Sequence, residues 1–177
     1  MRGKLVLLVC LGVPSILIAQ GQRPVPAQST DRIVREVRHQ LLMLPYYNVF
    51  DDLLCSVNGY SVTLKGEVTD PTLKRDAERV VKSIEGVEAV NNQIEVLPVS
   101  TMDDQLRLRL YRAIYSFAAL EKYALPVIKP IRIIVKNGHV TLEGVVDSQA
   151  DKDTAGVRAN GVSGVFSVTN NLKVGKS

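Results

Sequence analysis

A stretch of forty residues occurs twice in this chain, and this repeat constrains the fold more than any other feature. Residues 57–96 align without a gap with residues 135–174, a shift of 78 positions, and 13 of the 40 pairs are identical. Ordinary composition would give roughly two or three identities by chance. The most similar part is the string Val-Thr-Leu-x-Gly-x-Val, at 62–68 and 140–146. The chain is therefore a tandem duplication, with a first copy and a second copy of one small folding unit.

Each copy shows the pattern of a helix, a hairpin, a second helix and a final strand. In the first segment, apolar residues recur every three or four positions, which predicts an amphipathic helix. Two alternating runs joined around Asn58-Gly59 predict a β-hairpin, because both turn residues tolerate positive φ. The next helix begins at Asp70-Pro71 and ends at Gly86. The predicted unit is αββαβ, with a helix at 31–44, strands at 53–57 and 61–68, a helix after Asp70, and a strand at 87–96.

The second copy repeats this order with one insertion. Its strands match those of the first copy at a shift of 78, whereas its first helix matches at a shift of 73. Five extra residues therefore lie between that helix and the first strand, within residues 116–130. The string Thr101-Met-Asp-Asp104 resembles a capping box at the start of the helix. We therefore expect a larger loop before the first strand of the second copy.

The order of elements predicts an α+β fold made of two tandem αββαβ domains. Hairpin strands pair antiparallel, whereas a strand–helix–strand crossover brings the next strand in parallel. Each copy is therefore expected to form a three-stranded mixed sheet with two helices packed on one face, and the two small copies are expected to dock on each other. The glycine repeated within the second strand should mark a bulge or a close approach of two backbones. The repeated residues of this structural motif are Gly66, Gly86 and Asn92 in the first copy, and Gly144, Gly164 and Asn170 in the second.

The first 21 residues have the pattern of a secretory signal peptide. Two basic residues, an apolar run and the small-x-small sequence Ala19-Gln20-Gly21 follow one another as in a Sec-type signal. We therefore predict a periplasmic protein, with secretion or an uncleaved membrane anchor as alternatives. Cys10 lies inside the apolar run and does not fit a lipoprotein cleavage site. The predicted divisions are the signal peptide at 1–21, a flexible lead at 22–29, domains at 30–97 and 103–174, and a linker at 98–102.

Nothing in the sequence indicates catalysis or metal binding. His39 has no second histidine or cysteine nearby, and His139 lies in a hairpin turn. The pairs Asp51-Asp52 and Asp103-Asp104 stand at the boundaries of predicted elements and lack the ligand spacing of a calcium loop. Cys55, the one cysteine outside the signal segment, alternates with apolar residues and is expected to be a buried thiol. We therefore predict a protein that is not an enzyme and that needs no metal or other cofactor.

The repeated pattern resembles the BON domain. In the first copy the resemblance rests on Val-Thr-Leu-x-Gly-x-Val, on a helix with Ala77, and on the run Gly86-Val87-x-x-Val90-x-Asn92-x-Ile94-x-Val96, and the second copy carries the same elements. The resemblance covers nearly all of the chain after the signal segment. It implies αββαβ domains in a non-enzymatic envelope protein, of a family thought to bind phospholipid surfaces. Because the shared motif consists of core and turn residues, it implies the fold and does not locate a lipid site.

Charge is divided unevenly between the copies. Residues 31–97 carry 8 basic and 11 acidic side chains, a net charge of −3, whereas residues 103–177 carry 11 basic and 7 acidic side chains, a net charge of +4. This asymmetry fits an anionic partner for the second copy, or one copy that faces the other. Nucleic acid is not an expected partner, because secretion separates the chain from it and no basic stripe is present.

The loop between the first helix and the first strand is aromatic in both copies and is the candidate binding surface. Apolar and tyrosine side chains beside lysine or arginine suit an anionic phospholipid membrane. The alternative function is a protein–protein module that docks another envelope protein or a second copy of itself. The same side chains would instead be structural if they filled the space between the copies, so exposure of Tyr123, Leu125 and Ile128 is the observation that distinguishes these possibilities. The candidate residues are Tyr46, Tyr47 and Phe50 in the first copy, and Arg112, Phe117, Leu120, Lys122, Tyr123, Leu125, Ile128 and Lys129 in the second.

Overall fold

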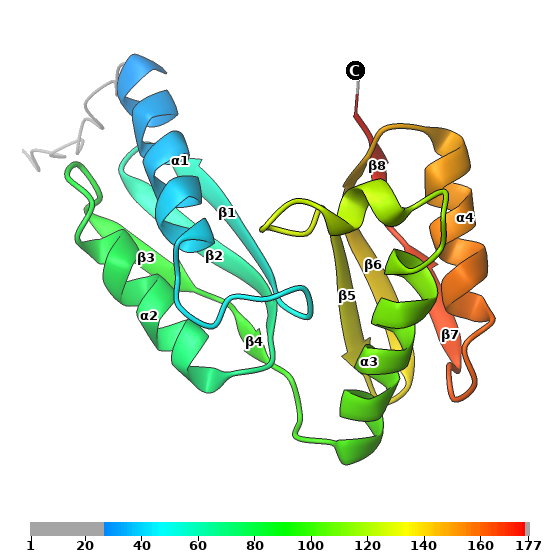
Figure 1. Cartoon of the computed structure of the whole chain (residues 1–177). Coiled ribbons are helices and arrows are strands. Elements are labelled where there is room, and N and C mark those ends of the chain that lie inside the picture. The colour runs from blue at the N-terminus through cyan, green and yellow to red at the C-terminus, as the bar shows by residue number, and fades with distance from the viewer. Residues whose placement is uncertain (1–26, 176–177) are drawn as a thin grey trace, which may run out of the picture.

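The computed structural model describes residues 27–175, which form two similar units side by side (Figure 1). The expected signal peptide and most of the expected lead lie outside the described residues. The first unit contains α1 (Ala27–Leu42), β1 (Asp52–Asn58), β2 (Ser61–Val68), α2 (Pro71–Lys82), β3 (Ala89–Asn92) and β4 (Glu95–Val96). The second contains α3 (Thr101–Tyr115), the 3-10 turn η1 (Glu121–Ala124), β5 (Ile131–Lys136), β6 (His139–Val146), α4 (Gln149–Asn160), β7 (Ser167–Asn170) and β8 (Lys173–Val174).

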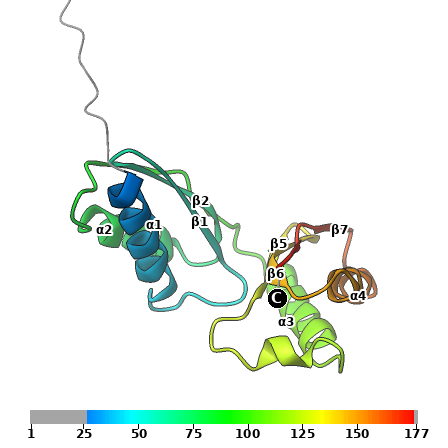
Figure 2. The ribbon, with the colours of Figure 1, turned by 90° about the horizontal axis from the view of Figure 1, so that it is seen from above.

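The predicted α+β fold is confirmed in both copies. Strand β1 pairs antiparallel with β2, and β2 pairs in parallel with β3 and β4. The second copy repeats this topology with β5, β6, β7 and β8. Figure 2 shows that the two helices of each unit lie on one side of its sheet. Among residues 27–175, none of the helices combines the length and the apolarity that crossing a membrane requires.

The last strand is divided in two in each copy, so each sheet has four strands where the sequence pattern predicts three. The repeated asparagine causes this break. The side-chain amide of Asn92 donates to the carbonyl of Lys74 on α2 (2.9 Å), and its side-chain oxygen accepts from the amide of Ile94 (3.2 Å). Asn170 makes the same two bonds, to the carbonyl of Lys152 and from the amide of Leu172. The asparagine thus satisfies backbone groups where the ladder is interrupted.

Each copy has its own apolar core between helices and sheet. The first helices contribute matching residues at the shift of 73: Ile33, Val37 and Leu41 in α1 correspond to Leu106, Leu110 and Ile114 in α3, and all six are buried. The second strands contribute Val62, Leu64 and Val68 in the first copy, and Val140, Leu142 and Val146 in the second. The identities in the repeat are therefore mainly core positions.

The glycine within the second strand is required by a close approach of two backbones, as the sequence predicts. Gly66 and Gly144 have φ of +114° and +122°. A β-carbon on Gly66 would lie 2.1 Å from the carbonyl oxygen of Asp52, and one on Gly144 would lie 1.9 Å from that of Pro130. Each distance is far inside van der Waals contact, so neither position accepts another residue without a shift of the neighbouring chain.

Several element boundaries differ from the sequence-based prediction. Helix α1 begins at Ala27 and not near Asp31, since Ala27 and Gln28 favour helix and extend it into the predicted lead. The first hairpin turns at Gly59-Tyr60, because Asn58 still pairs with Ser61.

Helix α3 is capped by Ser100 and not by Thr101, because the Ser100 hydroxyl accepts from the amide of Asp103. The Asp103 carboxylate instead accepts from the amides of Asn137 and Gly138, at 2.8 and 2.9 Å, and fixes the turn of the second hairpin.

We expect Gly144→Ala to lower the free energy of unfolding by at least about 2 kcal/mol, because the added methyl group meets a backbone carbonyl at a positive φ. Gly161→Ala is the matched control. Its β-carbon would lie no closer than 3.6 Å to a neighbour, so its effect should stay within about 1 kcal/mol. Urea unfolding of the two variants measures the difference. Equal stability of the two variants would contradict the close-approach explanation.

Candidate functional site

The loop before β1 crosses from the first copy to the second (Figure 1). We call residues 46–51 the first loop. The carbonyl of Val49 accepts from the amide of Ile133 on β5 (2.9 Å), and the carbonyl of Asn48 accepts from the guanidinium of Arg132 (2.9 Å). The same guanidinium lies over the ring of Tyr47, 4.4 Å from its centre. The first loop is therefore joined to the free edge of the second sheet.

Val49 is a core residue of the second copy although it belongs to the first. It is buried in one cluster with Ile114, Ile131 and Ile133. Phe50 packs at the margin of the same cluster, with its ring edge-on to Tyr111 at 6.4 Å between ring centres. We call the space between α3 and β5 that receives Val49 the second-copy groove. Tyr111, Arg132 and Ile133 contact the first loop there, and Ile114, Tyr115 and Ile131 belong to the same cluster. We take these six residues as its walls.

Asp51 holds the first loop in the shape that reaches the second copy. Its buried carboxylate accepts from both the amide and the hydroxyl of Thr69, at 2.7 and 2.8 Å, and from the amide of Asn48, at 3.1 Å. Tyr46, at the start of the loop, has a φ of +69° and an exposed side chain. The end of β2 therefore fixes the loop, and of the three candidate aromatics Tyr47 and Phe50 contact the second copy while Tyr46 faces solvent.

The equivalent groove of the first copy is open. A hollow of about 290 Å³ lies between α1 and β1. Leu42 and Leu54, which line this hollow, are 42% and 55% exposed. We call this hollow the first-copy groove; it is lined by Arg38, Leu41, Leu42, Tyr47, Leu53, Leu54 and Cys55. Six of these residues align with the six walls of the second-copy groove, at shifts of 73 for the helix and 78 for the strand.

The backbone of Cys55 faces the free edge of the first sheet. The carbonyl of Leu64, opposite Cys55 on β2, accepts from Gln93 on its other side. Leu64 and Cys55 are therefore a pair whose backbone groups point away from each other, as in Ile133 and Leu142. Burial raises the pKa of the Cys55 thiol, against the opposing effect of Arg38. The edge amide that holds Val49 in the second copy thus has a counterpart in the first, the amide of Cys55, for which residues 27–175 supply no backbone partner.

Two candidate residues of the loop before β5 belong to the core and not to the surface. Leu120 and Tyr123 are buried in the second copy's own cluster. The hydroxyl of Tyr123 accepts from the amide of Asp147 (2.7 Å) and donates to the carboxylate of Asp151 (2.8 Å). Burial is the largest of the effects that raise the pKa of this hydroxyl. Tyr123 accepts from the backbone amide that follows β6, as Asp51 accepts from the amide that follows β2. This bond explains why an aromatic side chain turns inward here.

The candidate cations of this loop are partly engaged within the copy. The ammonium of Lys122 lies 2.8 Å from Asp147 and 3.0 Å from Asp151, and bonds to these carboxylates raise its pKa. The ammonium of Lys129 donates to the carbonyls of Ala124 and Pro126, and so braces the loop. Arg112 is exposed on α3.

Phe117 is half covered by another cation of the same copy. The guanidinium of Arg158 lies 4.8 Å from the centre of its ring. The same guanidinium donates to the carbonyl of Ala113 on α3. Phe117 therefore packs against α4, although part of its ring faces solvent.

The exposed part of this loop is its apolar tip. Leu125 is 82% exposed, Val127 98% and Ile128 41%. We call residues 125–128 the second loop tip. Of the three residues chosen to distinguish a membrane surface from a structural role, Leu125 and Ile128 are exposed, whereas Tyr123 is buried within the second copy and not between the copies. Val127 and Val49 were not predicted as site residues, although they align with each other at the shift of 78 and each lies shortly before its first strand.

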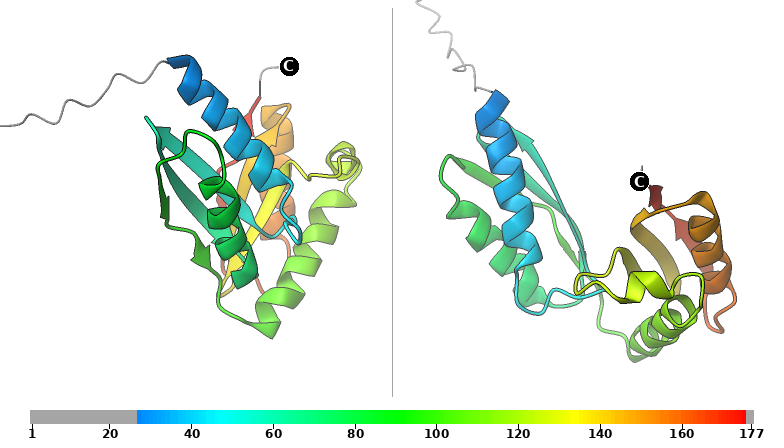
Figure 3. Two further views of the ribbon diagram at one scale, coloured as in Figure 1. Left: turned by 90° about the vertical axis from the view of Figure 1, so that its left-hand side faces the viewer. Right: turned by 45° about the horizontal axis from the view of Figure 1, so that its top comes forward.

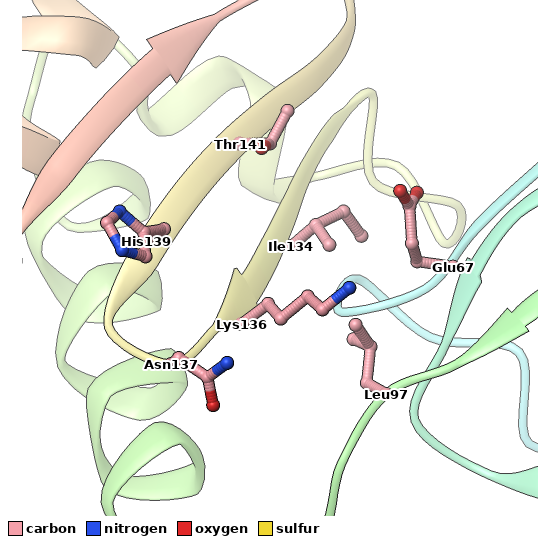
Figure 4. A pocket seen from close by; sticks show the side chains of 7 residues that line it. All are labelled: Glu67, Leu97, Ile134, Lys136, Asn137, His139 and Thr141. Carbon is pink, nitrogen blue, oxygen red and sulfur yellow. The ribbon is translucent and has the colours of Figure 1, made fainter.

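A second hollow, of about 280 Å³, lies between the two copies (Figure 4). Glu67 and Leu97 of the first copy face Ile134 and Lys136 of the second, with Asn137, His139 and Thr141 completing the lining. Lys136 also forms an ion pair with Glu95. Burial raises the pKa of Glu67, and the nearby Glu95 and Glu143 raise it further. The hollow is thus bounded by mixed charge where the sheets approach each other.

The same region contains a buried carboxylate, that of Asp52, which forms no ion pair with any other residue in the described part of the chain. Burial raises the pKa of Asp52 to about 6, and the carboxylates of Glu143 and Glu67 add to this effect against the nearby Arg132. Glu67 stands opposite Asp52 in the ladder of β1 and β2, so two like charges face each other across the strands. The contact between the copies therefore carries an electrostatic cost when Asp52 is ionised.

Comparison with known proteins identifies the family pattern in both copies. The family model of the BON domain matches residues 29–98 and 117–176. The osmotically-inducible protein Y of Escherichia coli (strain K12) is 31% identical over 125 residues, which are 69% of this chain and 61% of that protein. The match thus spans less than two thirds of that relative's length.

Two solved structures of CdsD, described as a structural protein of the type III secretion system of Chlamydia trachomatis, are distant matches. One is 13% identical, covers 82% of this chain and 93% of its own, and has a TM-score of 0.30. The other, of the C-terminal domain, is 12% identical, covers 80% and 96%, and has a TM-score of 0.29.

We expect the contribution of Asp52 to the free energy of unfolding to fall as the pH rises from about 4 to about 6. A carboxyl whose pKa is raised in the folded state binds more protons there than in the unfolded chain, so deprotonation destabilises the fold. Asp52→Asn should therefore be more stable than the parent by about 1–2 kcal/mol above pH 6, with solvent screening included, and similar to it below pH 4. Urea unfolding at several pH values measures this, and Asp153→Asn, at an exposed helix position, is the control. A variant less stable than the parent at pH 7 would contradict the assignment.

Proposed function

We propose that this chain, which belongs to the BON domain family, functions in binding and not in catalysis. The ligand we propose is a short, extended, apolar segment of another envelope protein, held in the first-copy groove. One observation carries this proposal: the second-copy groove holds Asn48-Val49-Phe50, while the aligned groove of the first copy is a hollow of about 290 Å³. The contact between the copies thus serves as a model of how the open groove would bind an extended segment.

The chemistry of the open groove supports an extended peptide. The edge of β1 offers the amide of Cys55 for a backbone hydrogen bond, as the edge of β5 offers Ile133. Leu42 and Leu54 give the groove apolar walls that are partly exposed to solvent. Addition of a segment at a free strand edge obtains its affinity from main-chain bonds and its specificity from pockets for alternate side chains. The groove thus fits a segment with a valine flanked by aromatic or branched residues.

We place this function in the periplasm. The pattern of residues 1–21 supports export, and the relative that shares 31% identity is named for its induction by osmotic conditions. A scaffold that captures exposed apolar segments would be of use where osmotic stress disturbs envelope proteins. This role, like the location, is part of the proposal.

A blocked peptide of residues 46–51 tests the groove. Bound in the groove, it should shield Cys55, the only cysteine of the chain from Gln22 onward, and should slow its alkylation at least threefold at millimolar concentration. A peptide with aspartate in place of the valine should have no effect, and Leu54→Glu should abolish the protection. The measurement is the rate of thiol alkylation. Equal rates with and without the first peptide would remove the proposal.

Peripheral binding to anionic phospholipid is the second candidate function. The observation that favours it is the second loop tip, where Leu125, Val127 and Ile128 are exposed together and Lys129 lies directly behind them. Apolar side chains can enter the headgroup region while nearby cations pair with anionic lipid. Lys122 supports this function less, since two carboxylates neutralise its charge. The family resemblance also implies phospholipid surfaces.

Co-sedimentation with vesicles tests the lipid candidate. The chain from Gln22 onward should sediment with phosphatidylglycerol vesicles at low salt and less with neutral phosphatidylcholine vesicles. Val127→Asp should reduce the bound fraction at least fivefold, because it places a charge on the apolar tip. Val99→Asp, at a linker position that is also 98% exposed, is the matched control. Equal failure to bind both vesicle types would exclude this function.

A further inference from the structure

We propose that the second loop tip, residues 125–128, folds back into the first-copy groove of its own chain and closes it. This inference rests on the proposed function, because it names the regulation of the same groove. The structure shows the open form, in which Val127 is 98% exposed and the groove is a hollow. In the closed form the carbonyl of Val127 would accept from the amide of Cys55, as the carbonyl of Val49 accepts from that of Ile133.

The second loop tip is the counterpart of the segment that already fills a groove. At the shift of 78, Tyr47, Val49 and Phe50 align with Leu125, Val127 and Ile128. The central valine is unchanged, Tyr47 and Phe50 correspond to smaller apolar residues, and Asn48 corresponds to Pro126. These alignments lie outside the forty residues of the repeat, yet they need no gap: Val49 lies four residues before Leu53, and Val127 lies four before the aligned Ile131.

The receiving residues differ between the grooves in a matched way. In the occupied groove the ring of Tyr47 meets the guanidinium of Arg132. The aligned positions are Leu125 and Leu54, which replace a cation–π pair with two leucines that are 82% and 55% exposed. In the occupied groove a cation contacts an aromatic ring, and in the open groove two apolar side chains would contact each other. The two partners therefore match each other in both grooves.

The arrangement of the two copies favours closure within one chain. Helices α1 and α3 run in opposite directions, and β5 is the strand of the second copy nearest to the first (Figures 1 and 2). The loops before β1 and β5 each project toward the other copy, as the right-hand view of Figure 3 also shows. If the second loop tip followed the path that the first loop takes, it would meet the first-copy groove.

The closed form is expected to be weaker than the contact already made. Leu54 cannot replace the hydrogen bond that Arg132 donates to the carbonyl of Asn48. The tethered loop nevertheless acts at a high effective concentration, which compensates for a weak contact. The chain therefore exchanges between open and closed forms, and a partner segment must compete with the loop for the groove. The loop sets a threshold of affinity for that partner.

A disulfide between position 127 and Cys55 tests the closure. The chain from Gln22 onward with Val127→Cys should form an intramolecular disulfide under mild oxidation, seen as a monomer of altered mobility on a non-reducing gel. Its yield should exceed that of the Val99→Cys control at least tenfold, since Val99 is equally exposed but lies in the linker. The peptide of residues 46–51 should lower the yield at least threefold, because it competes for the groove.

Two results would overturn the closure. A ladder of disulfide-linked multimers would assign the tip to the groove of a second chain, and a yield no higher than that of Val99→Cys would show that the tip does not reach the groove. The alkylation experiment with the parent chain and the peptide distinguishes the proposal that the groove binds a segment from the proposal that the loop tip closes it. If the peptide protects Cys55 but Val127→Cys does not close, the groove binds a segment and only the closure fails. If the peptide gives no protection, the function itself fails.

Discussion

The insertion of Val49 into the core of the second copy is the contact on which the arrangement of the chain depends. A unit of about 70 residues buries only a modest part of its surface, so a shared core residue matters to both copies. The contact is preorganised, because Asp51 fixes the loop through Thr69 and Asn48 before the loop reaches its partner. The burial of Asp52 and the hollow beside Glu67 are consequences of this docking.

The two copies fix the end of their second strand with different side chains. At the end of β2, the amide of Thr69 donates to the carboxylate of Asp51, whereas at the aligned position of β6 the amide of Asp147 donates to the hydroxyl of Tyr123. The five inserted residues of the second copy supply the turn that brings Tyr123 inward. As a result the second loop is anchored to its own copy and its tip stays free, while the first loop is anchored to both copies. The duplicated chain thus has one loop bound to the other copy and one loop whose tip is exposed.

The fold could be predicted because the identities of the repeat are residues whose roles are local. Gly66 and Gly144 are required by a backbone approach, and a strand pattern that contains glycine signals such a position. The break at Asn92 was not predicted, because it depends on a side-chain bond to a distant helix carbonyl. The groove was missed for a related reason: Asn48 and Arg132 are 84 residues apart, and periodicity carries no information on such contacts. The inward turn of Tyr123 depends likewise on a distant carboxylate, that of Asp151.

Part of the positive charge of the second copy is paired or buried, and this bears on what the chain can bind. Lys122 is paired with Asp147 and Asp151, Lys136 with Glu95, and Arg107 and Arg132 are buried against backbone carbonyls. Charges paired in this way stabilise the fold, and their partners reduce the electrostatic potential that they produce at a distance. The features left exposed at the loops are apolar: the walls of the first-copy groove and the second loop tip. Apolar contact gains strength from excluded water and is little affected by salt, unlike attraction to anionic headgroups. Geometry and charge together therefore favour recognition of an apolar segment over recognition of a charged surface.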